Sequence, residues 1–270
     1  MPSANELKTF GLAIERNQDW PRALCFGDSW FLYPLLPVDL HIRLRTTFKK
    51  TNFLNDSRPG RESSEIKTLL PSLRRLLGTF GFTALLVSMG GDDVVGTELQ
   101  EYVKRADEPQ SVGSTDWGVV PPEVRDHIRL SAFEAGLRFI VDDYQRLIDA
   151  RDHESPGTEI VTHNYAYLWP TGKPYKLPGI EKGPWIKPYL DAVGLEGDMA
   201  GQRAITDWLL DQFTRVMESI VSRTPRMRLV DSREVLPKLS DWDNEIHPTG
   251  GGFSKLVRDA WQPVLADILR

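Results

Sequence analysis

The chain has 270 residues, of which 40% are hydrophobic, 26% charged and 10% aromatic, and its formal net charge is −5. This size and composition are typical of a soluble globular protein with a proper core, and the acidic balance argues against nucleic acid or an anionic membrane as partner. No run approaches the ~20 apolar residues that span a bilayer. Residues 1–20 lack a secretory signal pattern, so we expect a cytoplasmic protein, with signal-independent export left open.

Five short apolar runs predict strands, and helical periodicity fills the intervals between them. The strands are expected at 22–26, 51–54, 82–87, 158–162 and 227–230. Helices are expected at 5–17, 33–49, 62–77, 94–104, 121–150, 203–222 and 253–268. The last helix should kink at Pro263, because proline has no N–H to donate within a helix.

The alternation of strands and helices over residues 1–270 predicts one three-layer α/β/α domain. The run 82–87 is continuously apolar, which indicates burial on both faces of a central, mainly parallel five-stranded sheet. Residues 165–201 are instead rich in proline, glycine and aromatic residues and show little periodicity. We expect this segment to be a lid or substrate cover, with simple packing onto the sheet edge as the alternative.

Two polar residues follow predicted strands and together suggest nucleophilic chemistry. Ser29 comes directly after the first strand, and His247 lies in a polar loop after the fifth. A serine hydroxyl needs a base to act as a nucleophile, and the carboxyl ends of parallel strands meet at one edge of the sheet. Alone, Asp28 or Ser29 would fit equally well as a helix cap, and His247 as a surface residue. Their shared edge favours a catalytic pair.

Four motifs at strand ends now make a resemblance clear. They are Gly27-Asp28-Ser29, Gly60, Gly90-Gly91-Asp92-Asp93 and Asn244-Glu245-Ile246-His247. In this order they resemble the first, second, third and fifth blocks of the SGNH hydrolases, also called GDSL esterases and lipases. The resemblance spans residues 27–247 and implies the flavodoxin-like SGNH fold.

The resemblance also implies a role for each matching residue. Ser29 corresponds to the nucleophile and His247 to the general base. The N–H groups of Ser29 and Gly60 and the side chain of Asp92 correspond to the oxyanion hole, whose donors matter greatly for rate. Glycine suits position 60 because it allows a sharp turn and leaves the N–H open to substrate.

Two positions depart from the family pattern. Asp92 stands where the family has Asn, and it could donate to an oxyanion only if burial kept it protonated. Asn244 stands where the family has the acid of the triad, and an amide stabilises an imidazolium less than a carboxylate does. Asp243 or Glu245 could supply the carboxylate instead, with Asp243 slightly favoured, and a dyad without an acid is a further alternative.

Other residues receive simpler predictions. Trp30, His163, Tyr165 and Trp185 are candidates for contacts with substrate, although a packing role fits His163 and Tyr165 as well. His41 and His153 are expected to be solvated, and residues 250–252, all glycine, to form a flexible lead into the last helix. No zinc motif, phosphate-binding glycine loop or dinucleotide fingerprint occurs, so we expect no cofactor.

The sequence therefore predicts a serine hydrolase that cleaves a carboxylic ester, of a lipid, an acetylated sugar or a related acyl group. The alternative is a catalytically impaired protein of the same fold that binds a ligand or carbohydrate. We expect a small-molecule ester as partner and no nucleic acid, and the sequence leaves the oligomeric state open.

Overall fold

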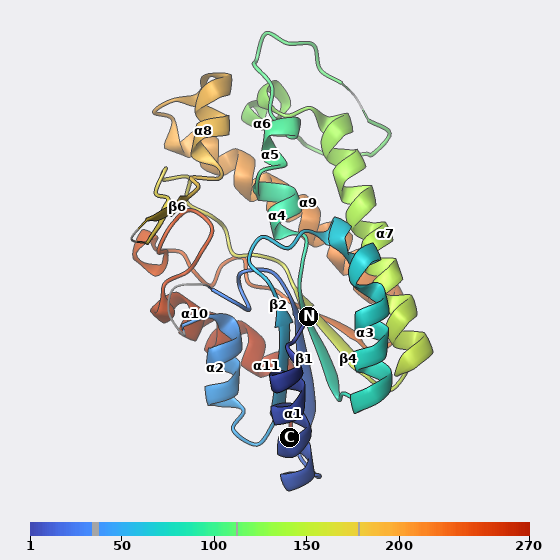
Figure 1. Ribbon diagram of the computed structural model, residues 1–270. Coiled ribbons are helices and arrows are strands. Elements are labelled where there is room, and N and C mark those ends of the chain that lie inside the picture. The colour runs from blue at the N-terminus through green and yellow to red at the C-terminus, as the bar shows by residue number, and fades with distance from the viewer. Residues whose placement is uncertain (34–37, 112, 178) are drawn as a thin grey trace.

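Five parallel strands form the central sheet of the computed structural model, which describes residues 1–33, 38–111, 113–177 and 179–270 (Figure 1). The strands are β1 Arg22–Gly27, β2 Asn52–Ser57, β3 Ala84–Ser88, β4 Glu159–His163 and β7 Met227–Val230. Their order across the sheet is β2-β1-β3-β4-β7, so the chain reverses direction across the sheet after β2. All five predicted strands are confirmed, and the second is longer than expected.

The burial of each strand follows its place in the sheet. Every residue of β3 is buried, as its continuous apolar run predicts, whereas the edge strand β2 alternates between buried and half-buried residues. In register, Leu24 of β1 lies between Leu54 of β2 and Leu85 of β3. The sheet interior is therefore apolar up to its carboxyl edge, where polar residues begin.

Helices cover both faces of the sheet and give the predicted three layers (Figure 1). They are α1 Ala4–Arg16, α2 Leu40–Thr47, α3 Ile66–Phe80, α4 Gly91–Val95, α5 Leu99–Tyr102, α6 Pro122–His127, α7 Leu130–Glu154, α8 Lys187–Leu190, α9 Met199–Arg223, α10 Gly250–Leu256 and α11 Gln262–Leu265. Helices α3, α7 and α9 pack together on one face, and α2, α10 and α11 on the other. The short helices α4, α5, α6 and α8 lie beyond the carboxyl ends of the strands.

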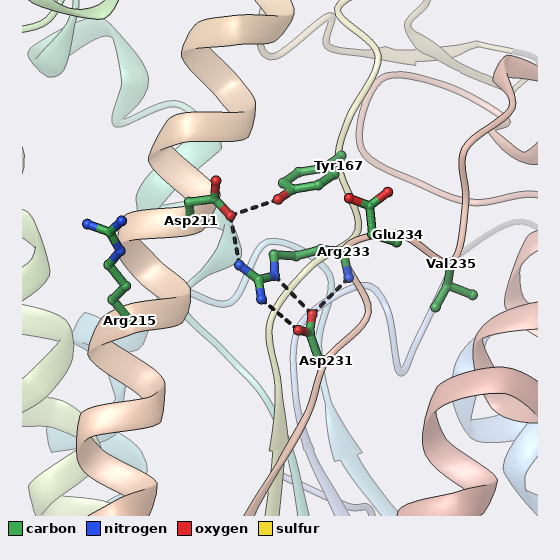
Figure 2. A pocket seen from close by; sticks show the side chains of 7 residues that line it. All are labelled: Tyr167, Asp211, Arg215, Asp231, Arg233, Glu234 and Val235. Atoms are coloured by element: carbon green, nitrogen blue, oxygen red, sulfur yellow. Dashed lines mark hydrogen bonds and ion pairs between the residues drawn. The ribbon is translucent and has the colours of Figure 1, made fainter. Parts of the chain in front are cut away.

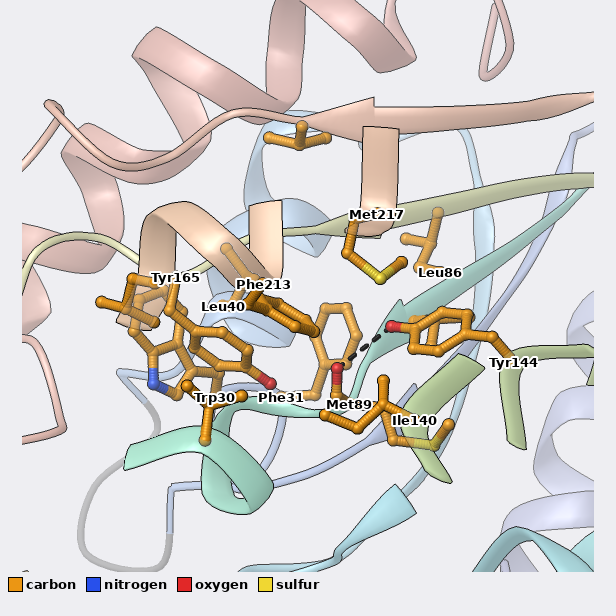
Figure 3. Packing of buried hydrophobic residues seen from close by; sticks show 14 of the residues in the cluster. Trp30, Phe31, Leu40, Leu86, Met89, Ile140, Tyr144, Tyr165, Phe213 and Met217 are labelled. Atoms are coloured by element: carbon orange, nitrogen blue, oxygen red, sulfur yellow. Dashed lines mark hydrogen bonds between the residues drawn. The ribbon is translucent and has the colours of Figure 1, made fainter. Parts of the chain in front are cut away.

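Aromatic and sulfur-containing side chains fill the core beneath the carboxyl edge (Figure 3). Tyr144 of α7 and Phe213 of α9 reach toward the loop that follows β3, and the hydroxyl of Tyr144 donates to the carbonyl of Met89 at 3.0 Å. Trp30 and Phe31, just after β1, are buried in the same cluster. The loops at this edge are thus built on a packed floor.

Two helices that the sequence predicts as continuous are interrupted in the structure. The expected helix 121–150 breaks between α6 and α7, because Ile128 turns extended and pairs with Val103 in an antiparallel bridge. Two backbone bonds flank this bridge, from Lys104 to His127 at 2.9 Å and from Arg129 to Tyr102 at 2.7 Å. The same pairing ends α5 at Tyr102. The single helix expected at 94–104 is therefore replaced by two short helices, α4 and α5.

The C-terminal region bears out the expected interruption of its last helix. A wide π-type turn at Val257–Trp261 separates α10 from α11, which places Pro263 in the first turn of a new helical segment where its missing N–H costs little. The glycines 250–252 are not a flexible lead, however. They form the first turn of α10, and Thr249 caps it by accepting the N–H of Gly252 at 3.0 Å.

Residues 165–201 contain a hairpin that the sequence did not reveal. Strands β5 Tyr175–Leu177 and β6 Ile180–Lys182 pair antiparallel, and helix α8 follows. Each strand has three residues, too few for an alternating pattern to emerge. Part of the expected helix 33–49 lies at 34–37, outside the described residues, and the remainder forms α2.

The close approach of β1 to β3 gives a test of the fold. A methyl group on Gly27 would overlap the carbonyl of Ser88, which is backbone and cannot rotate away. We expect Gly27→Ala to lower the free energy of unfolding by about 1–3 kcal/mol, measured by denaturant titration. Gly11→Ala is the control, since no described atom lies within 4 Å of its added methyl and alanine favours a helix. Equal stability of the two variants would contradict this packing.

Candidate active site

Ser29 lies at the carboxyl end of β1, at the bottom of a cavity. The backbone there is fixed on both sides, because Asp28 N–H donates to Ser88 of β3 at 2.9 Å and Arg58, just after β2, donates to Gly27 at 2.9 Å. The serine side chain is largely buried but lines the cavity. Its hydroxyl is therefore held in place where a bound molecule can reach it.

His247 meets this serine from the far end of the chain. Its loop follows β7 and is closed by an antiparallel bridge between Trp242 and Pro248. The imidazole Nε2 lies 2.8 Å from Ser29 Oγ, although the two residues are 218 positions apart. The structure thus brings together the two residues that the sequence placed at the same sheet edge.

Asn244 determines which nitrogen of His247 carries the proton. Its Oδ1 accepts the backbone N–H groups of Ile246 at 3.2 Å and His247 at 3.0 Å, so this atom is an acceptor. His247 Nδ1 lies 3.0 Å from the same oxygen and must donate to it. Nε2 is then the free acceptor that faces the hydroxyl of Ser29. An amide at position 244 therefore selects the tautomer that a general base needs.

The carboxylates on either side of Asn244 point elsewhere. Asp243 Oδ2 accepts the phenol of Tyr33 at 2.6 Å, and this phenol oxygen in turn accepts Nδ2 of Asn244 at 3.2 Å. Lys173 lies 3.7 Å from Asp243. Of the three candidates for contact with the imidazole, only Asn244 touches Nδ1. Tyr33 was not among the predicted site residues, and its only signal in the sequence is its nearness to Ser29.

Glu245 is fully buried and holds the segment 165–201 against the loop of His247. Each carboxylate oxygen accepts two backbone N–H groups, at distances of 2.6 to 3.1 Å. The donors are Gly172, Trp185, Ile186 and Lys187. Four donors satisfy the charge without a cation, as in other buried carboxylates. Glu245 therefore positions the segment 165–201 and does not orient the imidazole.

Burial sets the charge of His247. Desolvation lowers the pKa of its imidazole to about 3, and the negative charge of Asp243 opposes this shift only in part. His247 is therefore neutral at physiological pH, which is the form that accepts a proton.

Burial also acts on the two carboxyl groups near Ser29. It raises the pKa of Asp92 well above its usual range, and the neighbouring Asp28 adds to that rise. Oδ2 of Asp92 is shielded from solvent and has no hydrogen-bond partner among the described residues. The pKa of Asp28 rises to about 6 through burial, opposed by hydrogen bonds from Ser88 and Tyr165. The raised pKa favours the protonated form of the Asp92 carboxyl group, which is the form that can donate a hydrogen bond into the cavity.

The cavity over Ser29 has a volume of about 540 Å³. Gly60 and Asp92 line it beside Ser29 and His247, and Gly60 adopts the left-handed backbone (φ 67°) that its turn requires. The remaining walls are mainly apolar or aromatic, with two charged groups. They comprise Tyr33, Pro59, Glu62, Gly96, Thr97, Tyr175, Lys182, Trp185 and Ile246. A volume and lining of this kind suit a small organic ligand.

Three of the four predicted substrate contacts are wrong in position. Trp30, His163 and Tyr165 are buried below the cavity and do not line it. The indole of Trp30 donates to the carbonyl of Ile246 at 3.0 Å, and His163 Nε2 lies 2.9 Å from Ser88 Oγ. These three side chains are part of the packed floor beneath the cavity. Trp185, from the covering segment, does line the cavity, together with Tyr175 and Lys182.

Of the two histidines that were expected to be solvated, one is exposed and one is buried. His153 is exposed as expected, but His41 is buried in α2 against Phe53, and burial lowers its pKa to about 4. The expectation of a solvated His41 is therefore wrong, because α2 packs this face onto β2.

Solved structures with a similar arrangement of elements include several lipases. An extracellular lipase of Streptomyces rimosus matches with a TM-score of 0.55 and 15% identity, over 92% of this chain and 99% of its own. The goat rumen metagenome lipase Lip_vut3 matches with a TM-score of 0.53 and 13% identity, over 88% and 94%. A GDSL-like lipase of Parabacteroides merdae gives 0.52 and 12%, over 91% and 95%. This chain has the SGNH hydrolase fold.

Sequence comparison adds nothing to this assignment. No family model matches the SGNH-fold chain, and no curated protein matches it either. Within the described ranges, none of its helices has the length and apolar character needed to cross a bilayer.

A second cavity of the SGNH-fold chain, of about 520 Å³, is lined mainly by charged residues (Figure 2). Arg233, after β7, donates to Asp231 at 2.7 and 3.0 Å and to Asp211 of α9 at 2.8 Å. Tyr167 also donates to Asp211, at 2.7 Å. These charges neutralise one another and join α9 to the segments that follow β4 and β7. The cluster is therefore a structural link at the side of the sheet.

The four donors to Glu245 give a second test. In Glu245→Gln an NH₂ group replaces one oxygen and faces two N–H groups in either orientation of the amide. We expect a loss of about 2–3 kcal/mol in the free energy of unfolding, since buried donors lose their acceptor. Faster proteolytic cleavage between residues 171 and 187 should accompany it. The control is Glu181→Gln in β6, an exposed carboxylate 3.2 Å from Lys176. A Glu245→Gln protein as stable as this control would contradict the role of Glu245.

Proposed function

We propose that this protein is a serine hydrolase that cleaves a carboxylic ester through an acyl-enzyme. The observation that carries the proposal is the 2.8 Å contact between Ser29 Oγ and the unprotonated Nε2 of a neutral His247. The fold, shared with proteins named lipases, supports the same class of reaction.

The reaction would proceed in two halves. Ser29 Oγ attacks the ester carbonyl while its proton passes to His247 Nε2, which forms a tetrahedral intermediate and an imidazolium. The C–O bond to the alcohol then breaks, and Nε2 returns the proton to the leaving alkoxide. Water repeats the sequence on the acyl-enzyme, giving its proton to Nε2 and releasing the acid and Ser29. Both halves regenerate the neutral imidazole.

Three donors would stabilise the oxyanion. They are the N–H groups of Ser29 and Gly60 and the protonated carboxyl of Asp92, three residues that line the cavity. A neutral carboxyl group can donate a hydrogen bond, whereas a carboxylate would repel the developing charge. The substitution of Asp for the family's Asn is therefore compatible with catalysis as long as burial keeps Asp92 protonated.

The alternative is a protein that keeps the cavity but has lost the chemistry. Positions 92 and 244 suggested it, since both depart from the family pattern. The tautomer imposed by Asn244 and the raised pKa of Asp92 argue against it, because the first leaves Nε2 of His247 as an acceptor facing Ser29 and the second favours a carboxyl group that can donate.

A short-chain chromogenic ester tests the proposal directly. Wild-type protein should release the alcohol and be labelled at Ser29 by a fluorophosphonate, and Ser29→Ala should abolish both. Ser254→Ala is a matched control, because Ser254 lies in α10 and donates to the backbone of Gly250 at 2.9 Å. Hydrolysis that survives in Ser29→Ala would place the chemistry elsewhere, and inactivity on all esters without labelling would favour the binding protein.

The pH profile of kcat/KM tests the role of Asp92. Asp92 has a raised pKa, so the active, protonated form exists below that pKa and is lost as pH rises through it. We expect wild type to show a basic limb that Asp92→Asn lacks, because an amide donates at every pH. Asp92→Ala should lose about 10²–10³ in kcat, as for removal of an oxyanion donor elsewhere.

The acidic limb of the same profile reports on His247. Since its pKa is lowered to about 3, kcat/KM should persist well below pH 6, where an ordinary imidazole is protonated.

The basic limb decides the role of Asp92. A basic limb that is identical in wild type and Asp92→Asn would exclude Asp92 as the oxyanion donor.

A further inference from the structure

Asn244 orients the imidazole but carries no charge to balance an imidazolium. In an acid–histidine pair the carboxylate does both, and its loss is costly even where the geometry survives. The buried position of His247 increases the need for a nearby negative charge. The question is where the site finds one.

An unbroken chain of hydrogen bonds leads from Ser29 to a carboxylate. Ser29 Oγ faces His247 Nε2 at 2.8 Å, and Nδ1 donates to Asn244 Oδ1 at 3.0 Å. Asn244 Nδ2 donates to the phenol oxygen of Tyr33 at 3.2 Å, and that phenol donates to Asp243 Oδ2 at 2.6 Å. Every donor points toward Asp243, so each bond polarises the next in the same direction.

We propose that Asp243 is the acid of this site and acts on His247 through Tyr33 and Asn244. Asn244 sets the tautomer, and Tyr33 joins the amide to the carboxylate. Neither Tyr33 nor Asp243 touches the reacting atoms, so both are positioning residues. No proton travels along the chain. The imidazolium formed at His247 is stabilised by aligned dipoles that end on a negative charge.

Tyr33 is held for this role on three sides. Its ring packs on the imidazole of His247 with centroids 4.6 Å apart, and the ring of Tyr175 meets it edge-on at 5.7 Å. Its backbone N–H donates to Asp39 at 3.3 Å. Burial and the adjacent Asp243 raise the pKa of the Tyr33 phenol, so it stays protonated and keeps its donor.

The effect of Asp243 is moderate, because its side chain is 42% exposed and Lys173 lies 3.7 Å away. Solvent and this cation both screen the charge. Other ionisable groups share the cavity with His247 and also influence its titration. They are Glu62, Asp92, Tyr175 and Lys182.

Two substitutions separate the parts of the chain, provided that the proposed hydrolase activity is present. Asp243→Asn keeps an acceptor for Tyr33 but removes the charge, whereas Tyr33→Phe keeps the ring on His247 but breaks the chain. In both we expect the acidic limb of kcat/KM to move down by about 0.5–1 pH unit, because the imidazolium loses stabilisation. The same loss should lower kcat about three- to tenfold.

A third substitution distinguishes the chain from a general structural effect. Asn244→Asp puts a carboxylate directly on Nδ1, so Asp243 is no longer needed. In the Asn244→Asp background, Asp243→Asn should change kcat less than about twofold, which is strong coupling between the two positions. Asp107→Asn, at an exposed carboxylate in the segment after α5, controls for the lost net charge.

The ¹⁵N resonances of the His247 imidazole give a readout that needs no turnover. Asp243→Asn should lower the imidazolium fraction in acid relative to wild type and Asp107→Asn. If this shift occurs without hydrolysis or labelling of Ser29, the proposed function is wrong, but the role of the hydrogen-bond chain from His247 to Asp243 is supported. Hydrolysis by Ser29 with an unchanged titration in Asp243→Asn, or the same loss of kcat in both backgrounds at position 244, would overturn the proposal.

Discussion

The hydrogen bond between Ser29 and His247 is the contact on which the candidate site depends, and the sheet makes it possible. Ser29 follows β1 and His247 follows β7, which is separated from β1 by β3 and β4. The loop of His247 must therefore reach across two strands. The indole of Trp30 anchors it there by donating to the carbonyl of Ile246 at 3.0 Å. A buried tryptophan next to Ser29 thus helps to hold His247 at its distance from the serine hydroxyl.

Low polarity is the second constraint at this edge. The floor of the cavity is aromatic and the strands beneath it are apolar, so charges near Ser29 are costly. Burial moves the pKa of His247 and of Asp92 in the direction that favours the uncharged form of each. The two carboxylates of the loop that carries His247 lie on either side of Asn244, where Asp243 is half-exposed and Glu245 faces four N–H donors. Burial thus disfavours charge on the groups nearest Ser29.

The sequence predicted the features that depend on local pattern. Apolar runs predicted the five strands, and the carboxyl edge that these strands share predicted that Ser29 and His247 meet in one site. Features that depend on backbone N–H groups were out of reach. The amino-acid sequence does not indicate that Asn244 Oδ1 accepts two backbone N–H groups, or that Glu245 accepts four. The directions of these N–H groups are set only when the loops fold. The break before α7 was hidden for a similar reason, since a long-range bridge at Ile128 overrides helical periodicity.

Three consecutive polar residues in the last loop show how one short segment serves three purposes. Asp243 faces Tyr33 and solvent, Asn244 faces the imidazole, and Glu245 points inward to the N–H groups of the covering segment. The bridge between Trp242 and Pro248 closes this segment into a tight turn, in which neighbouring side chains leave in different directions. The imidazole and the wall that carries Trp185 are therefore attached to the same turn. A displacement of either one must move the other, so the imidazole and this wall of the cavity are positioned together.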